Sequence, residues 1–291
     1  MTDPVASRFQ HFAAIDWSGA AGERHRGIAV ALCQEGAPQL VRPGHCWSRG
    51  EVLDWLLEEL PTDTLVGFDM GISLAFADEA AFFPGWDESP PDARALWSMI
   101  DHLCADDPHL AATSFVGHAE AARHFRRHGG REGDLFGGGR GRFRVTELAQ
   151  QAMGCKPTSN FNLVGAAQVG KSSLTGMRLL HRLQGRLPIW PIDPLPDRGS
   201  VVVEIYTTLA AMAAGRSAGK SKMRSHAELN AALARLGSDP VPGEGPIADH
   251  ASDALLTAAW LRITAPDPAM WTPKGLTPQI AATEGWTFGA R

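Results

Sequence analysis

Long apolar runs, paired cysteines and an excess of positive charge are all missing from this chain. No segment reaches the length of about 20 apolar residues that a membrane-spanning helix requires. The N-terminal sequence MTDPVASRFQ lacks the apolar core of a signal peptide. We therefore expect a cytoplasmic protein that has no membrane partner.

The cysteines and the net charge restrict the classes further. The four cysteines are widely spaced without a CxxC pair, which indicates reduced thiols instead of a disulfide framework or a zinc site. The formal net charge of −5 argues against a nucleic-acid-binding field over the whole molecule, so any such surface must be local. The 291 residues suffice for one large domain or two small ones.

Three apolar segments each end in an acidic residue, and these are Asp16, Asp69 and Glu204. A continuous apolar run is typical of a central strand that is covered on both faces. Ligands of open α/β sheets lie outside the carboxyl ends of parallel strands, so we expect the three acids to share one site. Together with Asp253 they suit a hard cation with oxygen ligands, such as Mg²⁺. The alternative for Asp16 is that it only caps the turn that begins at Trp17.

The order of the predicted elements is strand, strand, strand, helix, strand. Apolar patterns and turn residues predict strands at 12–16, 27–32, 39–41 and 65–69. Ser48 and Glu51 form a capping box that begins a helix ending at Pro61. A fifth strand is expected at 201–206, followed by helices at 208–214, 225–236 and 249–263.

Between residues 75 and 199 the periodicity is weaker. Helices are expected at 92–104, 119–127, 146–153 and 174–183. A segment of this length is too long for a connection, which predicts a mostly helical inserted subdomain at 75–199 within a core of 1–74 and 200–291.

A basic stretch from Arg123 to Arg144 lies inside this segment. It holds seven arginines together with glycines and phenylalanines, among them Phe136 and Phe143. That composition favours a flexible loop that contacts substrate phosphates, with Arg140, Arg142 and Arg144 as candidates, joined by Lys220 from a second basic loop. The alternative is an ordinary solvated surface loop.

The last predicted helix begins with two aspartates and a histidine. Asp249, His250 and Asp253 lie near one face, where like charges destabilise a helix unless a cation lies between them. Asp249 serving as the N-cap is the alternative, but it does not account for Asp253, which has apolar neighbours.

Several short motifs resemble a known family. HASDAL is similar to the opening of the last helix in RuvC-type resolvases, which have the RNase H-like fold. The whole chain more closely resembles domain-of-unknown-function family 429, described as predicted RNase H-like nucleases. The matching motifs run from residue 12 to 289 and are AAIDWSGA, LVGFDMG, QVGKSSLTGM, VVVEIY, DHASDALLTAAW and TEGWTFG. One departure is Tyr206-Thr207-Thr208, because the family usually has proline after the aromatic residue.

The resemblance implies an α/β fold of the RNase H-like type. Its mixed five-stranded sheet would have the order 3-2-1-4-5, with strand 2 antiparallel. The implied activity is that of a nuclease, a hydrolase that cleaves phosphodiester bonds with two Mg²⁺ or Mn²⁺ ions. The partner would be a nucleic acid or nucleotide, with DNA, RNA and branched substrates all left open.

The same resemblance implies a role for each acid. Asp16 would bridge both ions, and Asp69 and Asp253 would each hold one. Glu204 would be a catalytic metal ligand or would orient one. His250 would be a ligand or would orient water.

The segment Gly165–Ser172 offers a competing interpretation. It fits the GxxxxGKS pattern of a P-loop, which would make the chain an ATP- or GTP-binding protein or kinase. Only a thin strand precedes it and no apolar strand ending in Asp follows, so Lys171 contacting phosphate within a nuclease is a second alternative. A third is a catalytically inactive RNase H-like protein that binds nucleic acid, against which the intact acids argue.

Overall fold

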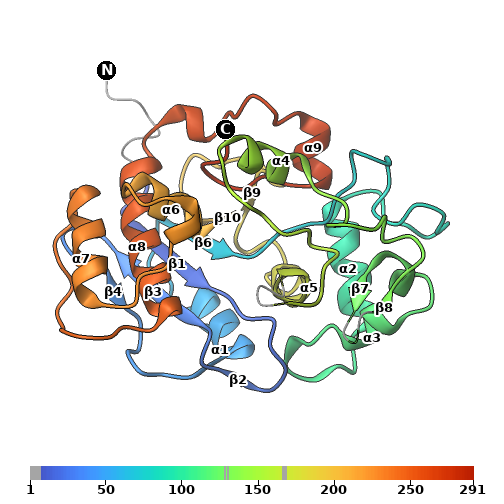
Figure 1. Ribbon diagram of the computed structural model, residues 1–291, viewed down its shortest axis with the longest axis horizontal. Helices are drawn as coiled ribbons and strands as arrows, with labels where there is room; N and C mark the ends of the chain where they lie inside the picture. The colour runs from blue at the N-terminus through green and yellow to red at the C-terminus, as the bar shows by residue number, and fades with distance from the viewer. Residues whose placement is uncertain (1–7, 128, 130, 166–168) are drawn as a thin grey trace.

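The computed structural model describes residues 8–127, 129, 131–165 and 169–291 and shows an α/β fold around a mixed six-stranded sheet (Figure 1). The strand order is β4-β3-β1-β6-β10-β9. Strand β3 is antiparallel to both of its neighbours, whereas β1, β6, β10 and β9 are parallel. The bounds are β1 His11–Asp16, β3 Ala29–Cys33, β4 Gln39–Leu40, β6 Thr64–Asp69, β9 Ile189–Trp190 and β10 Val201–Glu204.

The five predicted strands are present in the predicted order, but the prediction was one strand short. The missing strand, β9, has only two residues and lies between Pro188 and Pro191, so it carries no alternating pattern. It pairs with β10 at the edge of the sheet. Further two-residue pairs join β2 Arg24–His25 to β5 Trp47–Ser48 and β7 Arg126–Arg127 to β8 Arg131–Glu132.

Alternating side chains of the central strand face two different helical layers. Ala13 and Ile15 belong to one apolar cluster, and Phe12 and Ala14 belong to the other. The first cluster is shared with α1 and α5, and the second with α6, α7 and α8, which lie together at the left of Figure 1. This double covering explains why β1 is a continuous apolar run.

Most of the predicted helices are confirmed. The capping box at Ser48 begins α1 (Arg49–Asp54), which continues as a π-helical turn over Trp55–Glu59. The helix expected at 119–127 is wrong apart from a 3-10 turn, because its last two residues pair as strand β7. The other helices are α2 Ala93–Leu103, α3 Thr113–Gly117, α4 Val145–Ala152, α5 Val169–Arg182, α6 Thr207–Ala213, α7 His226–Arg235, α8 Asp249–Thr264 and α9 Pro278–Thr283.

The segment from residue 75 to 199 is closely joined to the sheet. Strand β9 lies within it, and helix α5 packs beside α2 and α1. Phe83, Trp97 and Leu174 belong to the same apolar cluster as Ile15 of the central strand. The boundary expected at residue 199 therefore does not separate two hydrophobic cores. Within the described residues, no helix is long and apolar enough to cross a membrane.

Candidate functional site

The centre of the candidate site is a pair of aspartates at the ends of β1 and β6. These parallel strands are neighbours, and Asp16 lies directly opposite Asp69 in their register. Adjacent strands are about 4.8 Å apart, so the two carboxyl groups emerge side by side. Trp17 closes the end of β1 by donating a hydrogen bond to the Thr175 hydroxyl of α5 at 3.1 Å. The end of β1 that carries Asp16 is thereby fixed to helix α5.

Helix α8 adds the third carboxyl group. It packs across β1 and β3, and Asp253 in its second turn is only 4% exposed. The helix begins at Asp249 with Ala248 as its N-cap, so the alternative that Asp249 is the N-cap is wrong. Lys222, on the segment that precedes α7, forms an ion pair with Asp253.

The three carboxyl groups interact unfavourably with one another. Burial, followed by the charges of Asp69 and Asp253, raises the pKa of Asp16 well above its ordinary value. Burial and the charge of Asp253 raise the pKa of Asp69 to about 7, against the opposing effects of Lys222 and Thr207. Burial also raises the pKa of Asp253 in spite of its ion pair. Among the described residues, no hydrogen-bond donor satisfies the Asp16 carboxylate.

The chemistry of this group suits a hard divalent cation, which prefers carboxylate oxygens. Among the described residues, however, no three histidine, cysteine or acidic side chains are arranged closely enough to hold a metal ion as they stand. Lys222 supplies the positive charge instead. Burial lowers its pKa, but the three carboxylates outweigh this effect and raise it. Its side chain is 52% exposed, so it is free to swing away from Asp253.

A cavity of about 520 Å³ lies beside Asp16 and Asp69. One wall is formed by the carboxyl ends of the strands and by Tyr206 and Lys222. The segment at 75–199 contributes further lining residues, which are Arg144, Glu147, Gln150, Pro157, Thr158, Asn160, Val169 and Ser172. The sheet and that segment therefore line the cavity together.

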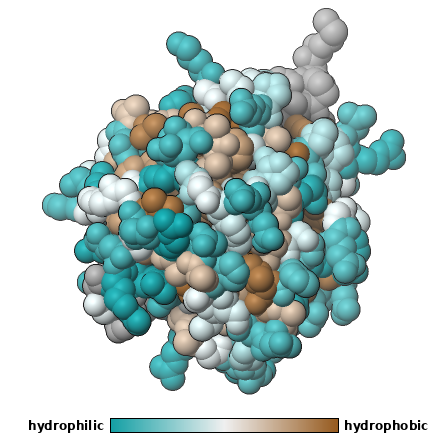
Figure 2. Space-filling view, turned by 90° about the vertical axis from the view of Figure 1, so that its right-hand side faces the viewer, coloured by the Kyte–Doolittle hydropathy of each residue, from teal (hydrophilic) through white to brown (hydrophobic). Residues whose placement is uncertain are grey.

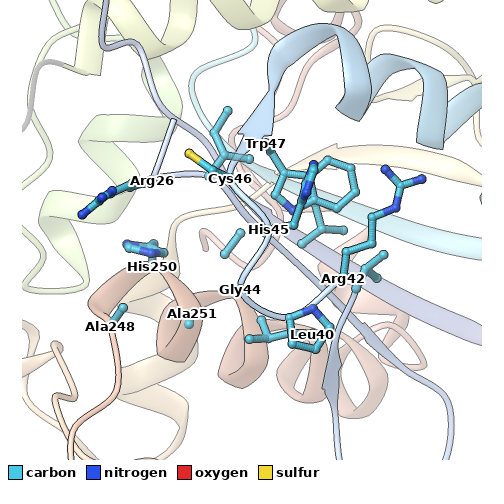
Figure 3. Close-up of a pocket in the computed structure, with 15 residues that line it drawn as sticks. Arg26, Leu40, Arg42, Gly44, His45, Cys46, Trp47, Ala248, His250 and Ala251 are labelled. Atoms are coloured by element: carbon cyan, nitrogen blue, oxygen red, sulfur yellow. The ribbon is translucent and has the colours of Figure 1, made fainter. Parts of the chain in front are cut away.

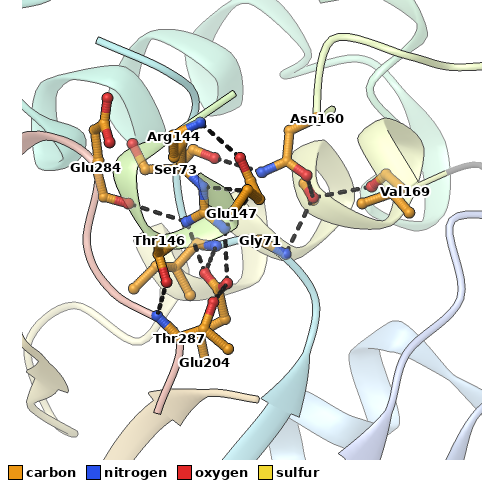
Figure 4. Close-up of polar contacts among 12 residues, drawn as sticks. Gly71, Ser73, Arg144, Thr146, Glu147, Asn160, Val169, Glu204, Glu284 and Thr287 are labelled. Atoms are coloured by element: carbon orange, nitrogen blue, oxygen red, sulfur yellow. Dashed lines mark hydrogen bonds and ion pairs between the residues drawn. The ribbon is translucent and has the colours of Figure 1, made fainter. Parts of the chain in front are cut away.

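Glu204 ends the next strand, but its carboxylate is already fully engaged (Figure 4). The Arg144 guanidinium donates to both of its oxygens at 2.7 Å, and the Ile72 backbone donates at 2.9 Å. The Thr287 hydroxyl donates to it as well. We therefore correct two predictions: Glu204 is not available as a metal ligand, and Arg144, 1% exposed, is not available to substrate phosphate.

The other predicted phosphate contacts are also occupied or distant. Arg142 pairs with Asp78 and donates to the Phe82 carbonyl at 2.7 Å. Arg140 donates to the Pro157 carbonyl at 2.6 Å and stacks over Phe143. Lys220 is exposed and does not line the cavity.

His250 lines a different cavity, of about 540 Å³, which Figure 3 shows at the start of α8. Arg26, Arg42 and His45 share this cavity with apolar side chains. Burial lowers the pKa of His250 and favours its neutral form. His250 also interacts electrostatically with Asp253 and Lys222, so its expected role beside the carboxylates stays a prediction.

The P-loop pattern lies partly outside the described residues, at 166–168. The described residues just before it form no strand of the sheet. Gly19 packs against the first turn of α5, and its N–H donates to the Ser172 hydroxyl at 3.1 Å. A phosphate cradle needs that turn to be open, so the arrangement does not favour a nucleotide at Lys171.

No protein-family model matches this chain, and neither does any curated protein or solved structure. The site is therefore described by its own geometry.

Sequence reasoning missed two residues of the site, Lys222 and Thr207. The basic loop at 215–222 was recognised, but nothing in its pattern distinguishes Lys222, which reaches Asp253, from Lys220, which does not. The Thr207 hydroxyl lies 3.4 Å from Asp69.

Proposed function

We propose that the protein is a metal-dependent hydrolase of phosphodiester bonds, of the nuclease type, with Asp16, Asp69 and Asp253 as its metal-binding residues. The observation that carries the proposal is the placement of Asp16 and Asp69 side by side at the ends of two parallel strands, with Asp253 of α8 near enough to raise the pKa of both. Burial and this repulsion disfavour the charged forms of the carboxyl groups, which supports a site that takes a cation. A divalent cation relieves this repulsion.

The order and directions of the strands support the same proposal. Five of the six strands follow the order expected of an RNase H-like sheet, and the resemblance to RuvC-type resolvases concerns the helix that carries Asp253. The proposed substrate is accordingly a nucleic acid or nucleotide, and the proposed cofactor is Mg²⁺ or Mn²⁺. The cytoplasmic location stays a proposal drawn from composition.

The residues of the site would have different roles in binding and hydrolysis. Asp16, Asp69 and Asp253 would hold the cation, which when bound polarises the phosphoryl oxygens and acidifies a water. Lys222 forms an ion pair with Asp253, and with a cation bound at the aspartates it would be available to the negative substrate. Arg144 and Glu204 join α4 to β10 through their paired hydrogen bonds.

The test compares Asp16→Asn with wild type in thermal melts with and without Mg²⁺, and in a phosphodiester hydrolysis assay. We expect the variant to be at least as stable without metal, because it removes one repelling charge, but to lose hydrolysis and most of the Mg²⁺-induced stabilisation. Asp87→Asn, at an exposed position, is the matched control and should behave as wild type. Equal Mg²⁺ shifts in Asp16→Asn and wild type would refute Asp16 as a ligand. A retained Mg²⁺ shift without any hydrolysis by wild type would favour an inactive binding protein.

A further inference from the structure

Several arginines of the basic stretch from Arg123 to Arg144 form ion pairs within the protein. Arg123 pairs with Asp134 at 2.8 Å and with Glu120 at 3.2 Å. Arg126 pairs with Glu132 at 3.2 Å. The same holds for the arginines nearest to the site, since Arg142 pairs with Asp78, and Arg144 with Glu147 and Glu204. A surface that follows a polynucleotide backbone needs free cations, because phosphate contacts supply most of the affinity.

The cavity itself is acidic. Asp16, Asp69, Glu147 and Glu204 line it, against only two cationic side chains, Arg144 and Lys222. Protein–DNA interfaces are instead strongly positive and cover roughly 1,000–2,500 Å². The lining therefore offers a phosphate no attraction except through a cation held by the aspartates and through Lys222.

The size of the cavity fits a small molecule. Its volume of about 520 Å³ is within the range of small-molecule sites, which is roughly 300–1,000 Å³. Pro157, Thr158 and Asn160 line the same cavity as the aspartates. The Asn160 side chain donates a hydrogen bond to the Ser73 carbonyl at 2.9 Å, so this part of the lining is held in place.

We infer that the cavity takes a small phosphodiester of dinucleotide size, and not a polynucleotide. The inference rests on the proposed function for the reaction and adds the class of substrate. In that reaction the oxygen of one water forms a bond to phosphorus and the bond to one alcohol oxygen breaks. One proton of the water ends on the released alcohol, and the other stays on the phosphomonoester or passes to solvent.

The experiment measures binding and hydrolysis separately, with Mg²⁺ present. The small probes are the dinucleoside monophosphates TpT and UpU, and the large probes are single- and double-stranded oligonucleotides of about 30 nucleotides, longer than the footprint of one binding module. We expect wild type to bind and hydrolyse the dinucleotides. We expect it to bind the oligonucleotides at least about tenfold more weakly, with little dependence on salt.

Two variants locate the binding site. Thr158→Trp places a large ring in the wall of the cavity and should weaken dinucleotide binding by about tenfold. Lys156→Trp places the same ring two residues away, at an exposed position outside the cavity, and should leave binding unchanged. Cooperative melts verify that both variants fold. The wild-type comparison of small and large probes decides the question even where Thr158→Trp is unstable.

The possible outcomes distinguish a failure of the small-substrate inference from a failure of the proposed hydrolase activity. Tighter binding or faster cleavage of the oligonucleotides would overturn the inference and leave the hydrolase intact. Binding of the dinucleotides without cleavage would refute the hydrolase and support the inference. Absence of dinucleotide binding, or equal effects of the two tryptophan variants, would overturn the inference.

Discussion

Two groups of acids lie along the same edge of the sheet, on neighbouring strands, in opposite electrostatic situations. Glu204 at the end of β10 receives both arms of the Arg144 guanidinium, together with a backbone N–H and a hydroxyl. Asp16 and Asp69, at the ends of β1 and β6, lie opposite each other, and the half-exposed Lys222 is the cation that interacts with both of them and with Asp253. The first group is internally satisfied, whereas the second is not.

The difference separates structural acids from candidate functional ones. A buried carboxylate that is fully paired contributes to the fold but has no capacity left for a ligand. A carboxylate whose pKa is raised by burial and by like charges keeps that capacity, at a cost in stability. The distinction is not absolute, since Glu147, which shares Arg144 with Glu204, also has its pKa raised to about 7 by burial. Even so, Glu147 is ion-paired, and Asp16 is not.

Removing the arginine should have the largest effect. Arg144→Met would leave Glu147 and Glu204 buried without a partner, which costs about 3–5 kcal/mol of unfolding free energy. Urea denaturation measures the loss. A loss below about 1 kcal/mol would show that the two acids simply take up protons, and it would erase the contrast between the two groups.

Removing one acid from each group should change stability in opposite directions. The folded pKa of Asp69, about 7, is above its unfolded value, so the folded state binds the extra proton and stability falls as pH rises from about 4 through 7. Asp69→Asn lacks this loss and should be more stable than wild type by roughly 1–2 kcal/mol near pH 8, with no advantage near pH 4.

Glu204→Gln is the matched comparison for Asp69→Asn. Near pH 8 it should be less stable than wild type, because an amide cannot accept both bonds from Arg144. Denaturation curves at the two pH values test both variants. A stabilised Glu204→Gln or a destabilised Asp69→Asn would reverse the assignment of the two groups.

The two cationic side chains, Arg144 and Lys222, should also differ in how much they contribute to stability. Lys222 is 52% exposed but Asp253 is only 5% exposed, so Lys222→Ala leaves a buried carboxyl group without its cation and should cost about 1 kcal/mol or slightly more. The Mg²⁺-induced rise in melting temperature should be retained or enlarged, because the lysine no longer competes for Asp253. Loss of the Mg²⁺ effect in this variant would mean that Lys222 helps to hold the cation site together.

The smallest effect is expected at Arg140. Arg140→Gln removes an exposed guanidinium that interacts with the Pro157 carbonyl and the Phe143 ring, so stability should change by less than about 0.5 kcal/mol. The salt dependence of oligonucleotide binding should also stay the same. A slope reduced by about one unit would show that Arg140 contacts phosphate and would restore the phosphate-contacting role of the arginine-rich loop.

Much of the fold was predictable from local patterns. The continuous apolar runs before Asp16 and Asp69 indicated central strands, and the capping box at Ser48 located α1 within one residue. Strand β9 was missed because two residues between prolines carry no periodicity. The helix expected at 119–127 failed because Arg126 and Arg127 pair with β8, and because Arg126 also bonds to the backbone of Phe161 and Leu163, a contact that the local pattern does not show.

The sequence by itself determined where the acids lie along the chain and that strand ends would bring them to one edge, because side-chain and strand periodicities are local properties. It left open which acids are paired. That was decided by tertiary structure, since Arg144 reaches Glu204 across 60 residues and Lys222 reaches Asp253 across 31. Electrostatic energy depends on the distance between charges in space and on the exclusion of water, and neither can be deduced from the order of residues in the chain.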